Sequence, residues 1–307
     1  MSITPSVTAA LGLTLLAVGA PLIPGIATRT KAIFAGRRGA PVWQAYADLW
    51  KLARRGMVYS TATTWIFRLA PVVVVAATLA AATLLPLDGH GAIIAFAGDA
   101  IAFVYLLALA RFVLVLAALD TGSSFEGMGA SRDVTFATLA EIGLFIALAA
   151  LAIGAHALSL TDMLGDAAAQ SVTRTQPASV LLAVSVFALA LAECSRLPVD
   201  DPATHLELTM VHEVMVLDHS GPDLAMILYA SALKLALFAA VILTILLPGT
   251  RTTGWLSLGL LFGAFVATGV AVGVVESVMA RLRLPRVPLY LAGASALALF
   301  GLILGLS

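Results

Sequence analysis

Long apolar runs separated by shorter polar connections dominate this chain. A helix that crosses a bilayer needs about 20 mostly apolar residues, and eight runs meet this length. They cover residues 7–28, 69–87, 92–119, 134–157, 178–195, 224–247, 255–278 and 288–306. Proline and glycine mark the joins, as at Pro86 to Gly89 and Pro248-Gly249. The pattern predicts an all-α, polytopic membrane bundle that forms a single transmembrane domain over residues 1–307.

Composition supports a membrane location. The chain is 61% hydrophobic and 11% charged, whereas a soluble domain is about half apolar and a quarter charged. The formal net charge is zero, so nothing indicates nucleic-acid binding. A single cysteine, Cys194, excludes an internal disulfide and a cluster held by four cysteines of this chain. The first residues lack the basic start of a secretory signal, so we expect the first run to be a retained helix.

Lysine and arginine are distributed asymmetrically between the two sides of the predicted bundle. Two of the 17 basic residues, Arg111 and Lys234, lie inside apolar runs, and two more, Arg174 and Arg251, lie on one side. The other thirteen occupy the opposite side. Cytoplasmic loops carry such an excess. The asymmetry therefore places residues 29–68, 120–133, 196–223 and 279–287 in the cytoplasm and both termini outside.

The first cytoplasmic loop contains a second kind of pattern. After Pro41, the apolar residues Val42, Ala45, Tyr46, Leu49 and Leu52 recur at helical spacing. This predicts a short amphipathic helix at the membrane surface. A basic surface helix that only fixes the orientation of the chain is the simpler interpretation of the same residues.

Ionisable residues inside the apolar runs need partners, because charge in hydrocarbon is costly. Asp99 and Arg111 are twelve residues apart, about 18 Å along a helix, so they cannot pair directly. Each requires a partner on another helix. Glu141 fits a structural hydrogen-bonding role as well as a proton-carrying one. The Gly/Ser-rich stretch from Asp120 to Asp133 lacks the ending of a phosphate-binding loop, and predicts a tight turn in which Asp133 caps the next helix.

The segment that follows the fifth run is densely ionisable. Glu193 and Arg196 are three apart and can share a helix face. Asp200, Asp201 and Glu207 follow within a few positions. Crowded carboxylates raise one another's pKa, which suits groups that exchange protons near neutral pH. A salt-bridged structural loop is the alternative.

Histidines lie close to these carboxylates. His205, His212 and His219 accompany Glu207 and Glu213. The pattern of two histidines around a glutamate that marks zinc proteases is absent, so no metal site is predicted. A hydrogen-bonded contact surface or a proton relay, using histidine near its usual pKa of about 6.5, fits better.

Four motifs together resemble a known family. They are the Arg-Gly-x-Pro, Gln and Asp-Leu-x-Lys pattern of residues 38–51, the 120–133 stretch, the run Pro198–Glu213, and the Glu-Ser-x-x-Ala-Arg-x-Arg-x-x-Arg-x-Pro pattern of residues 276–288. Over its whole length the chain resembles the respiratory complex I subunit 1 family, in the form carried by formate hydrogenlyase-type membrane subunits of group 4 nickel–iron hydrogenases. Val199, Ala203 and His205 stand where the quinone-reducing branch has Phe, Glu and Glu, so the resemblance favours the hydrogenase branch.

The resemblance implies a non-catalytic membrane anchor within an oxidoreductase complex of the bacterial or archaeal cytoplasmic membrane. The expected partners are hydrogenase large and small subunits, an iron–sulfur subunit and antiporter-like membrane subunits. The nickel–iron site and iron–sulfur clusters are expected in those partners, and no cofactor is expected in this chain.

The expected docking residues are Arg37, Arg38, Gln44, Asp48, Lys51, Asp120, Asp133, His212, Glu213, Glu276 and Arg281. The expected proton-transfer residues are Glu193, Glu207, Glu141, Asp200, Asp201, His205 and Asp99, with Arg196, Arg111 and Lys234 as charge partners.

Two other functions stay open from the sequence. One is the quinone-site subunit of a complex I-like NADH dehydrogenase, which quinone bound between the first loop and the loop after the fifth run would favour. The other is a stand-alone proton-coupled transporter in which Asp99, Arg111, Glu141 and Lys234 line a path. Co-purification with a soluble hydrogenase-like arm would exclude the transporter.

Overall fold

A computed structural model describes residues 5–87, 91–165, 176–200, 210–247 and 255–306. The described residues form helices joined by turns and contain no strand. The helices are α1 (Pro5–Gly19), α2 (Leu22–Phe34), α3 (Gln44–Ala53), α4 (Trp65–Thr83), α5 (Asp99–Asp120), α6 (Ser124–Ala155), α7 (Leu160–Met163), α9 (Gln176–Glu193), α10 (His212–Met215), α11 (Gly221–Leu246), α12 (Trp255–Val278), η2 (Leu284–Arg286) and α13 (Val287–Leu306).

Each of the eight predicted runs coincides with a helix or a helix pair. Among the described residues, six helices are long and apolar enough to span a membrane, and the pair α1 and α2, bent by 45° between Gly19 and Leu22, makes a seventh candidate. Helix α9 occupies the remaining run but is shorter. The all-α membrane bundle is therefore confirmed, while the count of eight crossings stays a prediction.

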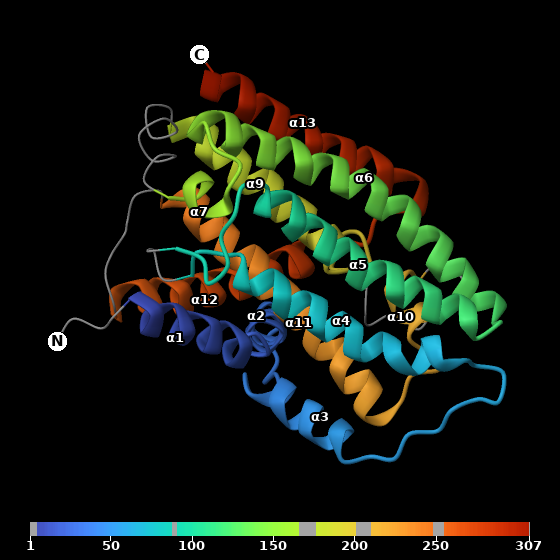
Figure 1. Cartoon of the computed structure of the whole chain (residues 1–307). Coiled ribbons are helices and arrows are strands. Elements are labelled where there is room, and N and C mark those ends of the chain that lie inside the picture. Colours follow the sequence, from blue (N-terminus) through green and yellow to red (C-terminus); the bar gives the residue numbers. More distant parts are fainter. Residues whose placement is uncertain (1–4, 88–90, 166–175, 201–209, 248–254, 307) are drawn as a thin grey trace.

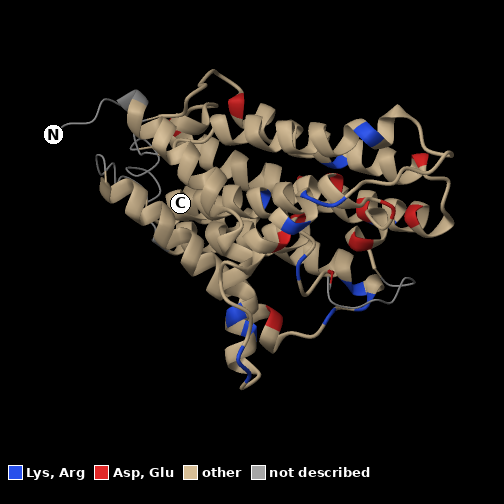
Figure 2. Ribbon diagram, turned by 90° about the horizontal axis from the view of Figure 1, so that it is seen from below, with Lys and Arg blue, Asp and Glu red and all other residues tan. Residues whose placement is uncertain are grey.

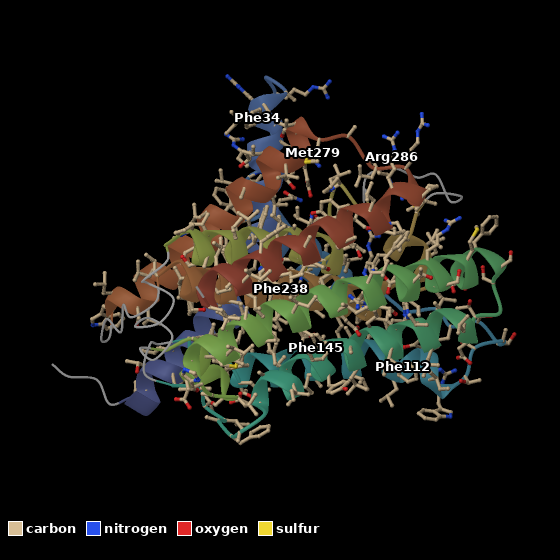
Figure 3. The ribbon with its side chains drawn as sticks, turned by 90° about the horizontal axis from the view of Figure 1, so that it is seen from above. Phe34, Phe112, Phe145, Phe238, Met279 and Arg286 are labelled. Carbon is tan, nitrogen blue, oxygen red and sulfur yellow. The ribbon has the colours of Figure 1, made fainter. Side chains whose placement is uncertain are left out.

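Helix α11 occupies the middle of the bundle. It contacts α2, α3, α4, α9 and α12, and its Phe238 is fully buried at the centre of Figure 3. Helices α6 and α13 run side by side along one edge, with α9 beneath them, while α4 pairs with α5 (Figure 1). Helix α12 packs on α2. The first residues of α1 and the last residues of α13 lie at the same end of the bundle (Figure 1).

Glycine permits the close approach of α12 to α2. A Cβ at Gly273 would lie 2.6 Å from the Cβ of Thr30 and 2.8 Å from the carbonyl oxygen of Ala27. Such distances leave no room for a side chain. Small residues commonly let membrane helices meet backbone to backbone in this way, and this contact fixes α2 against α12.

The structure corrects the prediction for residues 120–133. Only Thr121, Gly122 and Ser123 form a turn, and α6 already begins at Ser124. The glycines that suggested a longer turn are helical. A Cβ at Gly129 would lie 2.6 Å from Val214 Cγ1 and 2.9 Å from the Val211 carbonyl oxygen, so this glycine serves helix packing. Asp133 consequently lies well inside α6 and caps nothing.

The third predicted run is also shorter than expected. Helix α5 begins at Asp99, because Gly98 adopts a left-handed backbone with φ of 96° and ends the preceding non-helical segment. The amphipathic helix predicted after Pro41 is present as α3. Charged residues gather in the half of the bundle away from the ends of α1 and α13 (Figure 2). Which side of the membrane that half faces stays a prediction.

Candidate functional site

A cluster of ion pairs lies between four helices in the middle of the bundle. Arg111 of α5 contacts Asp133 at 3.4 Å and Glu141 at 3.2 Å, both on α6, and also Glu193 at the end of α9. Lys234 of α11 lies 2.6 Å from the same Glu193 carboxylate. The prediction that Arg111 has its partners on other helices is confirmed.

Helix geometry explains why these groups meet. Asp133 and Glu141 are eight residues apart, so about two turns and 12 Å separate them on neighbouring parts of one helix face. Arg111 lies between them and reaches both with different nitrogens. Because a lone charge inside an apolar bundle is costly, these groups are stable there only as a set.

The cluster is buried and not electrically balanced. Only 3% of the Glu193 side chain and 11% of the Arg111 side chain are exposed. Three carboxylates face two cations, which leaves one excess negative charge when all are ionised. In addition, Oε1 of Glu193 has no hydrogen-bond partner among the described residues. The cluster can therefore accommodate one more proton or a bound water.

A small cavity adjoins the cluster. Its volume is about 50 Å³, and Arg111, Glu193 and Lys234 line it together with Ser231 and His212. One water needs about 10–15 Å³ of such space and two to four polar partners. The cavity therefore has room for water beside Glu193.

A larger cleft opens beside this cavity. It has a volume of about 220 Å³ and lies between α2, α3, α10, α11 and the segment after α9. The cleft and the small cavity share Cys194, Ser195, His212 and Ser231 in their walls. These four residues separate the cluster from the cleft and hence from the end of the bundle where charges gather.

Asp200 organises the wall of the cleft. Its Oδ2 accepts hydrogen bonds from the backbone nitrogens of Val211 at 3.2 Å and His212 at 3.0 Å. Its Oδ1 lies 2.9 Å from Arg281 Nη2. The Leu282 nitrogen donates to the Pro198 carbonyl oxygen at 2.9 Å. Asp200 thus joins the end of α9, the start of α10 and the connection after α12.

Arg196 is not the charge partner of Glu193. Helix α9 ends at Glu193, and Ser195 has a positive φ of 51°, so the chain turns before Arg196 and the i, i+3 spacing of a helix no longer applies. Arg196 instead lies 3.6 Å from Glu276, which also pairs with Lys31 at 2.9 Å. Arg111 and Lys234 take the role predicted for Arg196.

Several expected docking residues have internal partners. Asp133 belongs to the cluster, and Asp120 accepts hydrogen bonds from the backbone nitrogen and the hydroxyl of Thr64, at 2.6 and 2.9 Å. Glu276 and Arg281 are held by the ion pairs described above. His212 and Glu213 line the cleft.

The remaining docking residues lie on the surface near α3. Arg37, Arg38 and Lys51 are exposed, and Gln44 donates a hydrogen bond to Asp48 across one turn of α3 at 2.9 Å. Asp48 also lines the cleft. These five residues therefore stay available to a partner that covers this end of the bundle.

Asp99 lies apart from the cluster. It accepts hydrogen bonds from the backbone nitrogen of Leu160 at 2.5 Å and from the Ser159 hydroxyl at 3.0 Å, and so fixes the start of α7. The predicted residues Asp201, His205 and Glu207 lie outside the described residues. Sequence reasoning missed Lys31, although Glu276 in the last turn of an apolar helix signals that a cation must be near.

These features define a multi-pass membrane protein with a buried ion-pair cluster beside a cleft. A family described as NADH dehydrogenase matches residues 7–304 of the chain. The chain therefore belongs to the NADH dehydrogenase family, the family of respiratory complex I subunit 1.

Two Escherichia coli (strain K12) proteins are similar in sequence. Hydrogenase-4 component C is 34% identical over 249 residues, which cover 81% of this chain and 77% of that protein. Formate hydrogenlyase subunit 4 is 32% identical over 275 residues, which cover 88% of each. The resemblance to the family and its hydrogenase branch is confirmed.

A solved structure shares the fold. A chain of the membrane-bound sulfane sulfur reductase, an archaeal respiratory membrane complex, superposes with a TM-score of 0.81 at 20% identity. The match covers 99% of this chain and 100% of that chain. The whole helical bundle described above is thus a fold that occurs in a membrane complex.

Proposed function

We propose that this chain is the membrane subunit of a multi-subunit nickel–iron hydrogenase of the formate hydrogenlyase type, located in the cytoplasmic membrane. It would anchor the soluble redox arm, formed by hydrogenase large and small subunits and an iron–sulfur subunit. It would also link their chemistry to proton movement toward antiporter-like membrane subunits. Similarity above 30% to two hydrogenase or hydrogenlyase components over most of the chain supports this assignment.

The observation that carries proton coupling is the position of Glu193. It lies between Arg111 and Lys234, and it borders a cavity that shares walls with the cleft. In this proposal a proton enters from the cleft past Ser231 and His212 and reaches the cluster through water in the small cavity. The excess negative charge of the cluster favours its uptake, because burial penalises an unbalanced charge.

Glu141 is the residue through which the proton would leave the cluster. With 31% of its side chain exposed, it is the most accessible carboxylate of the cluster, and it lies in the apolar helix α6. A partly exposed carboxylate within a membrane helix is costly unless protein covers it. A neighbouring membrane subunit against this part of α6 would remove that cost and accept the proton.

Substitution of Glu193 or Glu141 by glutamine tests proton coupling. Glutamine keeps the shape and hydrogen-bonding capacity of the side chain but cannot ionise. We expect Glu193→Gln or Glu141→Gln to leave assembly intact and to reduce proton movement in vesicles by about a hundredfold or more, as loss of a positioned proton-transfer group does. Dye-linked hydrogenase activity of the soluble arm should persist.

Glu126→Gln is the matched control. Glu126 is a buried carboxylate of α6 outside the cluster, 1% exposed, and accepts a hydrogen bond from the Asp218 nitrogen at 3.2 Å, which glutamine can also accept. It should leave proton movement unchanged. Normal proton movement in both cluster variants, at normal complex levels, would show that the cluster is structural.

The second candidate function, a quinone-site subunit of a complex I-like enzyme, is favoured by the cleft. Its walls combine apolar residues such as Pro24, Leu49 and Leu228 with the polar residues His212 and Ser231, a lining typical of small-molecule sites. It also lies between α3 and the segment after α9, where quinone binding would be expected. Quinone retained by the purified complex at this cleft, and lost with His212→Ala, would favour a quinone-site subunit.

A further inference from the structure

The outward face of α3 carries an unusual stripe of residues. Trp43, Ala47, Trp50 and Arg54 follow one another at the i, i+4, i+7 and i+11 spacing of one helix face. Trp43 is 68% exposed and Trp50 is 61% exposed. None of the ten residues of α3, all of which the structure describes, is buried. This tryptophan stripe therefore lies on the surface of the bundle, at the edge shown in Figure 1.

The level of α3 along the bundle follows from its contacts with the first two helices. The Tyr46 hydroxyl donates to the carbonyl oxygen of Val18, and the Val42 backbone approaches Gly25 closely enough to exclude a Cβ. Val18 lies 13 residues after the start of α1, roughly 20 Å along that helix, and Gly25 lies further on, beyond the 45° bend before α2. Because the hydrocarbon layer is about 30 Å thick, α3 lies toward the boundary opposite the start of α1.

Arg54 gives the stripe a charged group with free hydrogen-bond donors. Its guanidinium lies over the Trp50 ring, 4.3 Å from the centroid. Within the described part of the chain the N–H groups of this guanidinium have no hydrogen-bond acceptor. These donors match the geometry of a phosphate.

The surrounding loop has a strong positive charge. Residues 29–68 contain eight lysines and arginines and a single acidic residue, Asp48. Basic clusters of this size on an amphipathic helix next to the membrane attract anionic lipids. Tryptophan prefers the level of the lipid headgroups.

We propose that the tryptophan stripe binds the headgroup of an anionic phospholipid, with the phosphate held by Arg54 and the indoles of Trp43 and Trp50 at the boundary of the acyl chains. The site is separate from Gln44, Asp48 and Lys51 of α3, which are the residues expected to contact the soluble arm. Since Ala45 and Leu49 on the inner face of α3 line the cleft, the bound lipid fixes one wall of that cleft.

Tryptophan fluorescence tests the site on the full-length chain. Trp65→Phe and Trp255→Phe leave Trp43 and Trp50 as the only indoles, and both replaced residues are at least 70% exposed, so little packing is lost. The protein is reconstituted into nanodiscs that contain brominated phosphatidylglycerol or, at the same mole fraction, brominated phosphatidylcholine. Bromine quenches a nearby indole.

We expect brominated phosphatidylglycerol to quench Trp43 and Trp50 more strongly than brominated phosphatidylcholine does, with a local enrichment of about fivefold, the effect of one cation beside an anionic surface. Arg54→Gln should abolish this preference while both lipids still quench. Arg55→Gln is the matched control. It removes the same charge one residue away, off the stripe, and should keep the preference.

Three outcomes would overturn the proposal. Equal quenching by the two lipids would leave no headgroup site. An equal effect of Arg54→Gln and Arg55→Gln would mean a diffuse attraction of the whole loop. Absence of quenching by either lipid would show that the stripe does not face the lipid. None of these readouts depends on proton movement, so the proposed function and the lipid site can fail separately.

Discussion

His219 illustrates how a single buried residue can make stability depend on pH. Its imidazole stacks on Phe67 with the ring centroids 3.9 Å apart, and only 3% of the residue is exposed. Burial lowers the pKa of His219 to about 4. The residue lies between α10 and α11, close to the half of the bundle where charges gather.

The sign of the effect follows from proton binding. The unfolded chain takes up a proton at His219 near pH 6.5, whereas the folded chain does so only near pH 4. Stability must therefore fall as the pH drops from about 6.5 to 4, by at most about 3 kcal/mol. His219→Phe keeps the ring stack and should remove this part of the pH dependence. Thermal unfolding in detergent between pH 7 and 4.5 measures it, and identical pH profiles for the two proteins would contradict it.

Loss of the Lys234 charge should lower the stability of the folded chain, because Lys234 balances part of the charge of the buried Glu193 carboxylate. Lys234→Met leaves the buried Glu193 carboxylate with Arg111 alone. Breaking a buried ion pair in this way costs about 3–5 kcal/mol. Adding Glu193→Gln removes one of the three carboxylates that Arg111 alone would then have to balance, so the double variant should be more stable than Lys234→Met. If the second substitution lowered the melting temperature further, the two residues would not be coupled as described.

At the scale of elements, the contact between α12 and α2 depends on one glycine. Gly273→Ala would place a Cβ 2.6 Å from Thr30 and should cost about 1–3 kcal/mol, as overpacking of a well-packed interior does. Gly263→Ala on the same helix is the control, because a Cβ there meets nothing within 4 Å. Melting temperatures of the two variants in the same detergent should differ clearly, and similar values would argue against this packing.

Elements also show what sequence could and could not predict. The apolar runs located the helices, because hydrocarbon length and the cost of unpaired backbone groups dictate a long apolar helix. The start of α6 was missed because Gly127 and Gly129 suggested a turn, although packing against α10 is what Gly129 permits. Arg111 and Lys234 could be identified as needing partners, but which carboxylates they meet depends on how the helices are arranged around each other.

The error at Arg196 has a similar cause. Spacing along the sequence implied a pair with Glu193 only if α9 continued past Ser195, and the positive φ there ends the helix geometry. An i, i+3 spacing places two side chains on one face only while both residues belong to the same helix. Beyond the end of the helix the spacing no longer predicts a contact.

At the scale of the whole molecule, the charged end of the bundle is where we expect the soluble arm. Arg37→Gln together with Arg38→Gln removes two exposed cations after α2. The remaining attraction between the arm and this surface is weaker, so less salt is needed to screen it and the arm should dissociate at a lower salt concentration. Exposed charges are screened beyond about 10 Å at 0.1 M salt. The fraction of the arm retained during purification in a salt series measures this.

A second pair of arginines provides the control for docking. Arg283→Gln with Arg286→Gln removes the same charge from the connection before α13. The expected docking residue of this connection, Arg281, is held by Asp200, so this variant should leave the salt dependence unchanged. Equal loss of the arm in both double variants would indicate general electrostatic attraction instead of docking near α2.

The length of α6 has a mechanical consequence. Its 32 residues make a rod of about 48 Å, which exceeds the hydrocarbon layer by roughly 18 Å. Its first turns are held to residues 210–218 of the same chain, because Glu126 accepts a hydrogen bond from the Asp218 nitrogen and Arg132 donates one to the Met210 carbonyl oxygen. Further along, the same helix carries Asp133 and Glu141. A continuous helix does not bend easily, so it acts as a lever. Tilting the helix by about three degrees, which moves its tip by roughly 2.5 Å at that length, would also turn the two carboxylates that contact Arg111. Spin labels at Ser131 and Ile142 should then keep their mutual distance while both move relative to α13 when the arm docks.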